Sequence, residues 1–126
     1  MYDNWVFNKW ETPLSAVGAL ELQRLTDCNG FLEIVCEDLE SSAPHLWIVI
    51  FQSAIGYRSL GESFRNQLWK EWDINQYGRT VYVENSDFLL ALVKEPVTEN
   101  LRHFMIVTRD DVIEVLSVPD PQIIEL

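Results

Sequence analysis

The side chains that most often perform acid–base chemistry are scarce in this sequence. Histidine is the commonest general acid or base, and the chain has two, His45 and His103. Brought together by folding, they would bind a divalent metal with help from carboxylates such as Glu37, Asp38 or Glu40. Metal sites in sequences are recognised by fixed ligand spacing, which these residues lack. We therefore predict that both histidines lie at strand ends and that they bind no metal.

Nucleophiles and phosphate-binding loops are no better represented. Neither Cys28 nor Cys36 has a histidine or cation at a spacing that would activate a thiolate. Ser53 lacks the glycine two residues earlier that marks a nucleophile elbow. The five glycines are scattered, so no loop is predicted to hold a phosphate. We expect two free thiols, with Cys36 buried, no cofactor and no enzymatic activity.

The charge of the chain is strongly unbalanced. Twenty Asp and Glu face nine Lys and Arg, for a net charge of -11 on 126 residues. A phosphate backbone would be repelled, so nucleic acid and anionic membranes are excluded as partners. The longest apolar run, Leu46–Phe51, is too short to cross a bilayer, and the first residues lack the basic start of a secretory signal. We expect a cytoplasmic protein.

The abundance of aromatic residues indicates a folded chain. Five Trp, six Phe and four Tyr accompany the acidic residues, whereas acidic disordered segments are poor in aromatics. The length is typical of one domain, so residues 1–126 are predicted to form a single domain with an acidic surface.

Positive charge gathers in the middle of the chain. The net charge is -6 over residues 1–57, -1 over 58–102 and -4 over 103–126. Aromatic and arginine side chains dominate binding hot spots. In this middle stretch the candidate binding residues are Tyr57, Arg58, Arg65, Trp69 and Arg79. Glu37 and Asp38 are the candidates for an acidic docking surface. Solubility and packing are the alternative roles for both sets.

Local patterns predict the first strands. Leu20 and Leu22 alternate with polar residues, the segment 27–30 has turn chemistry, and residues 31–38 again resemble a strand. These segments predict a β-hairpin. Residues 46–51 are apolar on both faces, which predicts a central strand covered on both sides, by a helix on at least one.

Two helices are predicted further on. Ser59 and Glu62 have capping-box spacing, and apolar residues then recur every four positions as far as Trp72. A second helix is predicted from Asp87 to about Lys94, capped by Ser86. Strands are expected at 81–83, 103–108 and 112–116. The order favours an α+β fold: a mostly antiparallel sheet of about five to six strands, with two main helices packed on one face.

Binding is favoured over catalysis. In general character the chain resembles the small acidic immunity proteins that bacteria carry against toxins, with Tyr57-Arg58, Glu62 and Arg65 as its only patterned stretch. That resemblance implies a non-enzymatic protein that neutralises a basic toxin or similar basic partner. Complementary charge would guide the two proteins together.

Two other hypotheses stay open. In one, a pocket between sheet and helix binds an anionic small molecule. Its clamp would be Arg58, Arg65, Arg79 and Arg102, and its lining Tyr57, Tyr82 and Trp47. In the other, the chain forms a homodimer or larger homo-oligomer through its N-terminal aromatic residues or Ile123 and Ile124.

Overall fold

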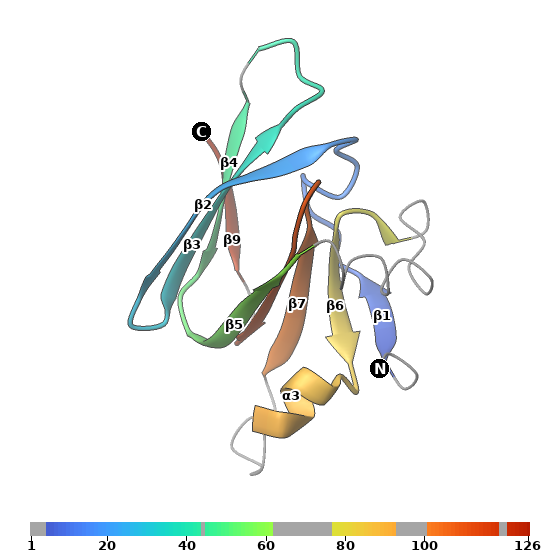
Figure 1. The fold of residues 1–126 in the computed structure, drawn as a ribbon, viewed down its shortest axis with the longest axis vertical. Helices are drawn as coiled ribbons and strands as arrows, with labels where there is room; N and C mark the ends of the chain where they lie inside the picture. The colour runs from blue at the N-terminus through green and yellow to red at the C-terminus, as the bar shows by residue number, and fades with distance from the viewer. Residues whose placement is uncertain (1–4, 44, 62–76, 93–100, 119–120) are drawn as a thin grey trace.

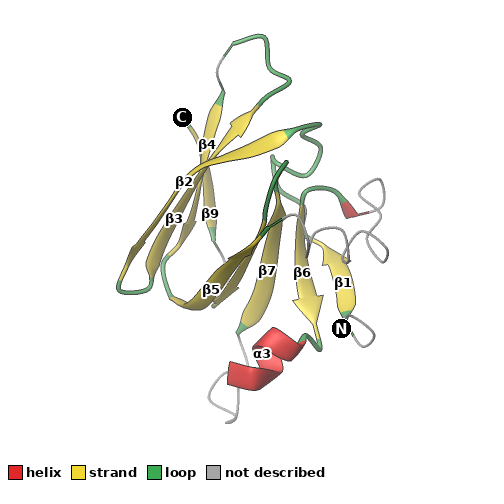
Figure 2. Ribbon diagram, in the orientation of Figure 1, coloured by secondary structure: helices red, strands yellow, loops and turns green. Residues whose placement is uncertain are grey.

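The computed structural model describes residues 5–43, 45–61, 77–92, 101–118 and 121–126. Most of these residues lie in β-strands, as Figures 1 and 2 show. The strands are β1 Val6–Lys9, β2 Leu20–Cys28, β3 Phe31–Asp38, β4 Leu46–Phe51, β5 Ala54–Leu60, β6 Thr80–Glu84, β7 Arg102–Val107, β8 Val112–Ser117 and β9 Gln122–Glu125. One short helix, α3 Asp87–Leu92, lies wholly within the described residues.

The strands form two antiparallel sheets. The five-stranded sheet has the order β1-β6-β7-β8-β5, and the four-stranded sheet has the order β2-β3-β4-β9. Side chains from both sheets form one apolar core, in which the rings of Phe51 and Phe104 lie 5.5 Å apart. Trp10 closes the core with its ring 4.9 Å from that of Phe104. Alternate residues of a strand point to opposite faces, so each sheet gives one face to this core.

The five-stranded sheet is buried on its other face as well. A second cluster there contains Trp5, Val83, Met105 and Val112, all nearly inaccessible to solvent. Every residue of β8 is buried, Glu114 included. A carboxylate in such a setting needs partners, because burying a charge without them is costly. Glu114 finds these partners in Arg58 and His103.

The predicted α+β class, with two main helices on one face of a single sheet, is wrong. The described residues form nine strands in two antiparallel sheets, with one short helix. Ser59 and Leu60, expected to begin a helix, are instead the last residues of β5, which pairs with β8. The spacing of Ser59 and Glu62 is a local signal, and strand pairing with a distant segment overrides it. The rest of that predicted helix, from residue 62 to Trp72, lies outside the described residues.

Several local predictions are confirmed. The hairpin of β2 and β3 turns at Asn29 and Gly30, which have φ values of 51° and 89°, and the Asp27 carboxylate accepts a hydrogen bond from the Gly30 N–H. Helix α3 begins at Asp87, and the Ser86 hydroxyl accepts a hydrogen bond of 3.1 Å from the Leu89 N–H. Its predicted end near Lys94 lies outside the described residues.

The prediction that residues 46–51 form a central strand is confirmed, but the predicted cover on both faces of this strand is wrong. One face of β4 packs in the core, but Ile48 and Ile50 on the other face are only half-buried. Its neighbours in the sheet are β3 and β9, and β9 follows a proline-rich stretch that gave no strand signal. No helix within the described residues is long and apolar enough to cross a membrane.

Candidate functional site

A buried chain of polar side chains crosses the five-stranded sheet, formed by Arg58, Glu114, His103 and Ser86. Arg58 Nε donates to Glu114 Oε2 at 2.5 Å, and Arg58 Nη2 donates to Oε1 at 3.2 Å. Glu114 Oε1 lies 2.9 Å from Nε2 of His103, whose Nδ1 lies 2.6 Å from the Ser86 hydroxyl. Strands β5, β8 and β7 therefore connect to the start of α3 through one polar chain.

The cations around Glu114 keep it ionised. Burial raises the pKa of this carboxyl, but the donors and charges of His103 and Arg58 outweigh burial and hold the pKa below its usual range. The Arg58 guanidinium forms two bonds to the carboxylate, a geometry that is stronger than a single contact. The Cζ atom of this guanidinium lies 4.2 Å from the centre of the Phe88 ring on α3.

Ser86 links His103 to helix α3. The Nε2–H does not point along a hydrogen bond to Glu114, so that contact is electrostatic. Nδ1 of His103 lies 2.6 Å from the Ser86 hydroxyl oxygen, which accepts a hydrogen bond from the Leu89 N–H.

Ser86, His103 and Glu114 have the residue types of a hydrolase triad, but their setting is that of a structural anchor. All three have an exposed fraction of 0%. The Ser86 oxygen already accepts the helix N–H, and aromatic edges from Trp5 and Phe88 meet the His103 ring at 5.3 and 5.4 Å. In this conformation the Ser86 hydroxyl is inaccessible to solvent, and the polar side chains connect α3 to the sheet.

The outer face of the four-stranded sheet is the second candidate site, and its exposure to solvent rises from the buried Val35 through the half-buried Ile48 to the exposed Ile124. Its centre is an apolar row in which Val35 pairs with Ile48 and Ile48 with Ile124. Because these residues alternate with core residues such as Ile34 and Val49, they point away from the core. We call the surface made by this row and its neighbours the acidic face. Its members are Glu21, Arg24, Glu33, Val35, Glu37, Leu46, Ile48, Ile50 and Ile124.

Carboxylates surround the apolar row on the side of β2 and β3. Glu21 and Glu37 are direct cross-strand partners, an arrangement that destabilises a sheet through like-charge repulsion. Long contacts of 3.3 Å relieve each of them: Arg109 reaches Glu21, and the Gln23 amide donates to Glu37. Arg24 alone brings a positive charge among the residues of this face.

Comparison with known proteins assigns this chain to no family. No family model, curated protein or solved structure gives a significant match to this chain. Its function is therefore inferred from its own residues.

The candidate residues from the sequence fall in separate places. Glu37 belongs to the acidic face, but Asp38 points the other way and its carboxylate accepts a hydrogen bond from the Glu40 N–H in the following loop. Tyr57 is 40% exposed on β5, at the edge of the five-stranded sheet. Arg65 and Trp69 lie outside the described residues.

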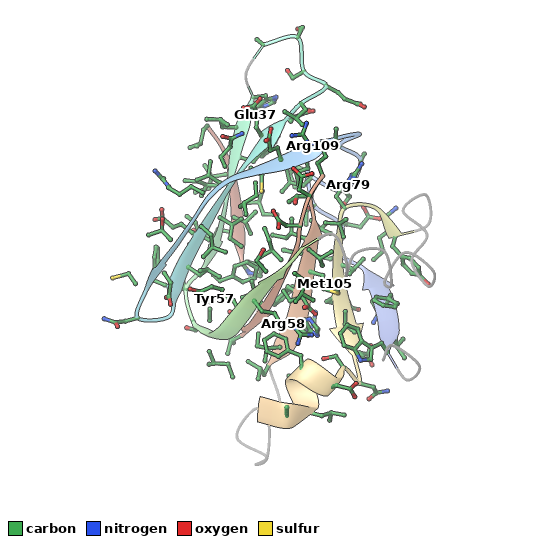
Figure 3. The ribbon with its side chains drawn as sticks, in the orientation of Figure 1. Glu37, Tyr57, Arg58, Arg79, Met105 and Arg109 are labelled. Atoms are coloured by element: carbon green, nitrogen blue, oxygen red, sulfur yellow. The ribbon has the colours of Figure 1, made fainter. Side chains whose placement is uncertain are left out.

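The three described arginines of the predicted anion clamp do not converge. Arg58 binds Glu114, Arg102 lies 4.8 Å from the Tyr82 ring, and Arg79 donates to the carbonyl oxygens of Val17 and Gly18. In Figure 3 Arg58 lies just above helix α3, and Arg79 lies higher in the view, well away from Arg58. An open cavity of about 470 Å³ beside Arg79 is lined also by Lys9, Glu11 and the residues 15–18. At this cavity the Arg79 guanidinium holds the loop of residues 15–18 through its hydrogen bonds to the Val17 and Gly18 carbonyl oxygens.

The histidines do not form the metal site considered from the sequence. His45 Nε2 lies 2.6 Å from the Glu125 carboxylate, whereas His103 is buried in the polar chain. Among the described residues no group of three His, Cys, Asp or Glu is placed to hold a metal ion.

Sequence reasoning missed both candidate sites in part. Glu114 was detectable, because it interrupts the apolar run of residues 112–116 and such a carboxylate needs a buried partner. Ser86 was identified only as a helix cap. Ile48 and Ile124 lie in one apolar row only because β4 and β9 are neighbours, and no local sequence pattern predicts that pairing.

Proposed function

We propose that this chain is a non-enzymatic binding protein whose acidic face docks a basic partner protein. The observation that carries the proposal is the row of Val35, Ile48 and Ile124, which is exposed at the Ile124 end and flanked at the Val35 end by Glu21, Glu33 and Glu37. An apolar centre within a polar rim is the usual anatomy of a protein interface.

The apolar row supplies binding free energy. Ile124 is 45% exposed, and Ile48 and Ile50 are half-buried on the same face. Removing the rest of each isoleucine from water contributes on the order of 1 kcal/mol per residue. The row lies in a regular sheet, so little ordering of the backbone opposes binding.

The carboxylates supply attraction at a distance and selectivity. Lysine or arginine from a partner would relieve the repulsion between Glu21 and Glu37, which the free chain offsets only through long contacts. The net charge of -11 adds a long-range field that raises the association rate of basic proteins and lowers that of acidic ones.

A partner of this charge fits the immunity-type function considered from the sequence. Proteins that cut nucleic acid are basic because they bind phosphate. A cytoplasmic protein that neutralises such a toxin would cover its basic surface, and we propose that role for the acidic face.

The test is capture from a lysate of the source cells by the tagged chain and two variants. Glu33→Lys/Glu37→Lys reverses two charges of the acidic face. Glu11→Lys/Glu84→Lys makes the same change in charge at the other sheet, at the end of β6 and just after β1. We expect a basic protein to be retained at low salt by the wild type and the control but not by the face variant. Equal retention by all three would refute this docking surface.

A further inference from the structure

The acidic face ends at an open strand edge. Strand β9 is the last strand of the four-stranded sheet, and among the described residues no strand pairs with its far side (Figure 1). The Leu126 N–H donates to the Leu46 carbonyl, so residues 122, 124 and 126 direct their backbone groups toward β4. The N–H and C=O groups of Ile123 and Glu125 therefore face outward.

This edge lacks the bulge and the cross-link to another segment that protect the opposite edge of the same sheet. The opposite edge strand, β2, has a bulge between Leu22 and Arg24, and its Leu20 carbonyl accepts a hydrogen bond from Arg109 N–H. Strand β9 pairs in regular register and has a single charged residue, Glu125. Regular, apolar edges are templates for pairing with another strand.

We propose that the basic partner binds by adding an extended segment to β9, which continues the sheet. This inference rests on the proposed function of the acidic face. The added strand would carry an apolar side chain beside Ile124, extending the row of Val35 and Ile48. It would carry a lysine or arginine beside Glu125, on the opposite face of the sheet. The recognised segment thus alternates apolar and basic residues.

Charge argues against a second copy of this chain as the added strand. The side chain of Glu125 is 57% exposed and pairs with His45, so two β9 strands in contact would add carboxylates to the same edge. Each copy also carries a net charge of -11. A basic segment replaces this repulsion by attraction.

The probe for the test is an octapeptide of alternating lysine and valine, added to the full ¹⁵N-labelled chain. We expect the amide exchange of Ile123 and Glu125 to slow when the peptide binds. Glu125→Pro removes one outward N–H without touching the bonds to β4, and proline is tolerated at such edge positions. Its affinity for the peptide should fall about tenfold below that of Glu125→Ala, which lacks the carboxylate but keeps the N–H.

Two further measurements separate the outcomes. A peptide N-methylated on alternate residues, so that it cannot donate to β9, should bind about tenfold more weakly to the wild type, which tests strand addition without any variant. Equal binding of both peptides, with unchanged exchange at Ile123 and Glu125, would overturn strand addition. Unchanged retention of the basic protein by Glu33→Lys/Glu37→Lys would instead overturn the acidic face. A dimer of the free chain that Glu125→Pro abolishes would replace the basic segment with a second copy.

Discussion

Arg58 and Glu114 face each other across the neighbouring strands β5 and β8, with Nε of the arginine 2.5 Å from Oε2 of the glutamate. The carboxylate has an exposed fraction of 0%, while the arginine side chain keeps 37% of its surface in water. The Glu114 carboxylate therefore stays ionised inside the five-stranded sheet because the Arg58 guanidinium, which is partly in water, neutralises its charge. His103 extends this pair to Ser86 and to helix α3.

Replacing Glu114 by glutamine should destabilise the fold. The amide is neutral and leaves Arg58 without its counter-charge, so we expect a loss of about 2 kcal/mol in the free energy of unfolding, measured in urea. Glu33→Gln, on the acidic face, is the control and should change stability by less than about 0.5 kcal/mol. Equal effects of the two variants would mean that the buried pair contributes nothing beyond surface charge.

Acid should remove the same contribution. The pKa of Glu114 is lower in the folded chain than its usual value of 4.5, so the folded state favours the ionised carboxylate. Its stabilisation is fully present above that usual value and is lost as the pH falls through the lower folded pKa. The stability difference between wild type and Glu114→Gln should therefore shrink as the pH is lowered below 4.5. A difference that grows with acidification would contradict the sign of this shift.

Replacing Ser86 by alanine should loosen helix α3. The change removes the hydroxyl that caps the helix at the Leu89 N–H and that contacts His103. We expect a loss of about 1–2 kcal/mol, with faster amide exchange at Leu89 and Leu90. Ser59→Ala, at an exposed position of β5, should leave both measurements unchanged. Unaltered exchange in α3 after Ser86→Ala would argue against the anchor.

The two thiols should differ in reactivity. Cys28 is exposed, whereas Cys36 is buried and burial raises its pKa to about 12. A thiol reagent at mildly alkaline pH should modify Cys28 alone in the folded chain, and both cysteines in denaturant. In Cys28→Ser no fast modification should remain. Rapid modification of Cys36 in that variant would show that the core between the sheets opens readily.

The sequence predicted what depends on neighbouring residues. Asn29 and Gly30 were identified as the turn of a hairpin because their residue types adopt positive φ, and Ser86 was identified as a helix cap. These signals act within a few residues, and tertiary packing agreed with them. The same local reasoning failed at Ser59, where pairing of β5 with β8 outweighs the capping-box spacing.

Both candidate sites depend on relationships between distant segments. Glu114 and Arg58 are 56 residues apart, and their contact follows from the order β8-β5. The apolar character of residues 46–51 was taken to require cover on both faces. The structure places one face in the core and leaves the other as the half-buried acidic face, so an apolar pattern of this kind does not require cover on both faces.

The most direct test of the acidic face is carboxylate labelling in the complex. The chain alone, and the chain bound to the basic protein that it retains, are treated with a carbodiimide and an amine, and the label on each glutamate is measured by mass spectrometry. The account predicts slower labelling of Glu33 and Glu37 in the complex, with Glu11 and Glu84 unchanged. Unchanged labelling of Glu33 and Glu37, with protection at Glu11 or Glu84, would place the partner on the other sheet and contradict the account.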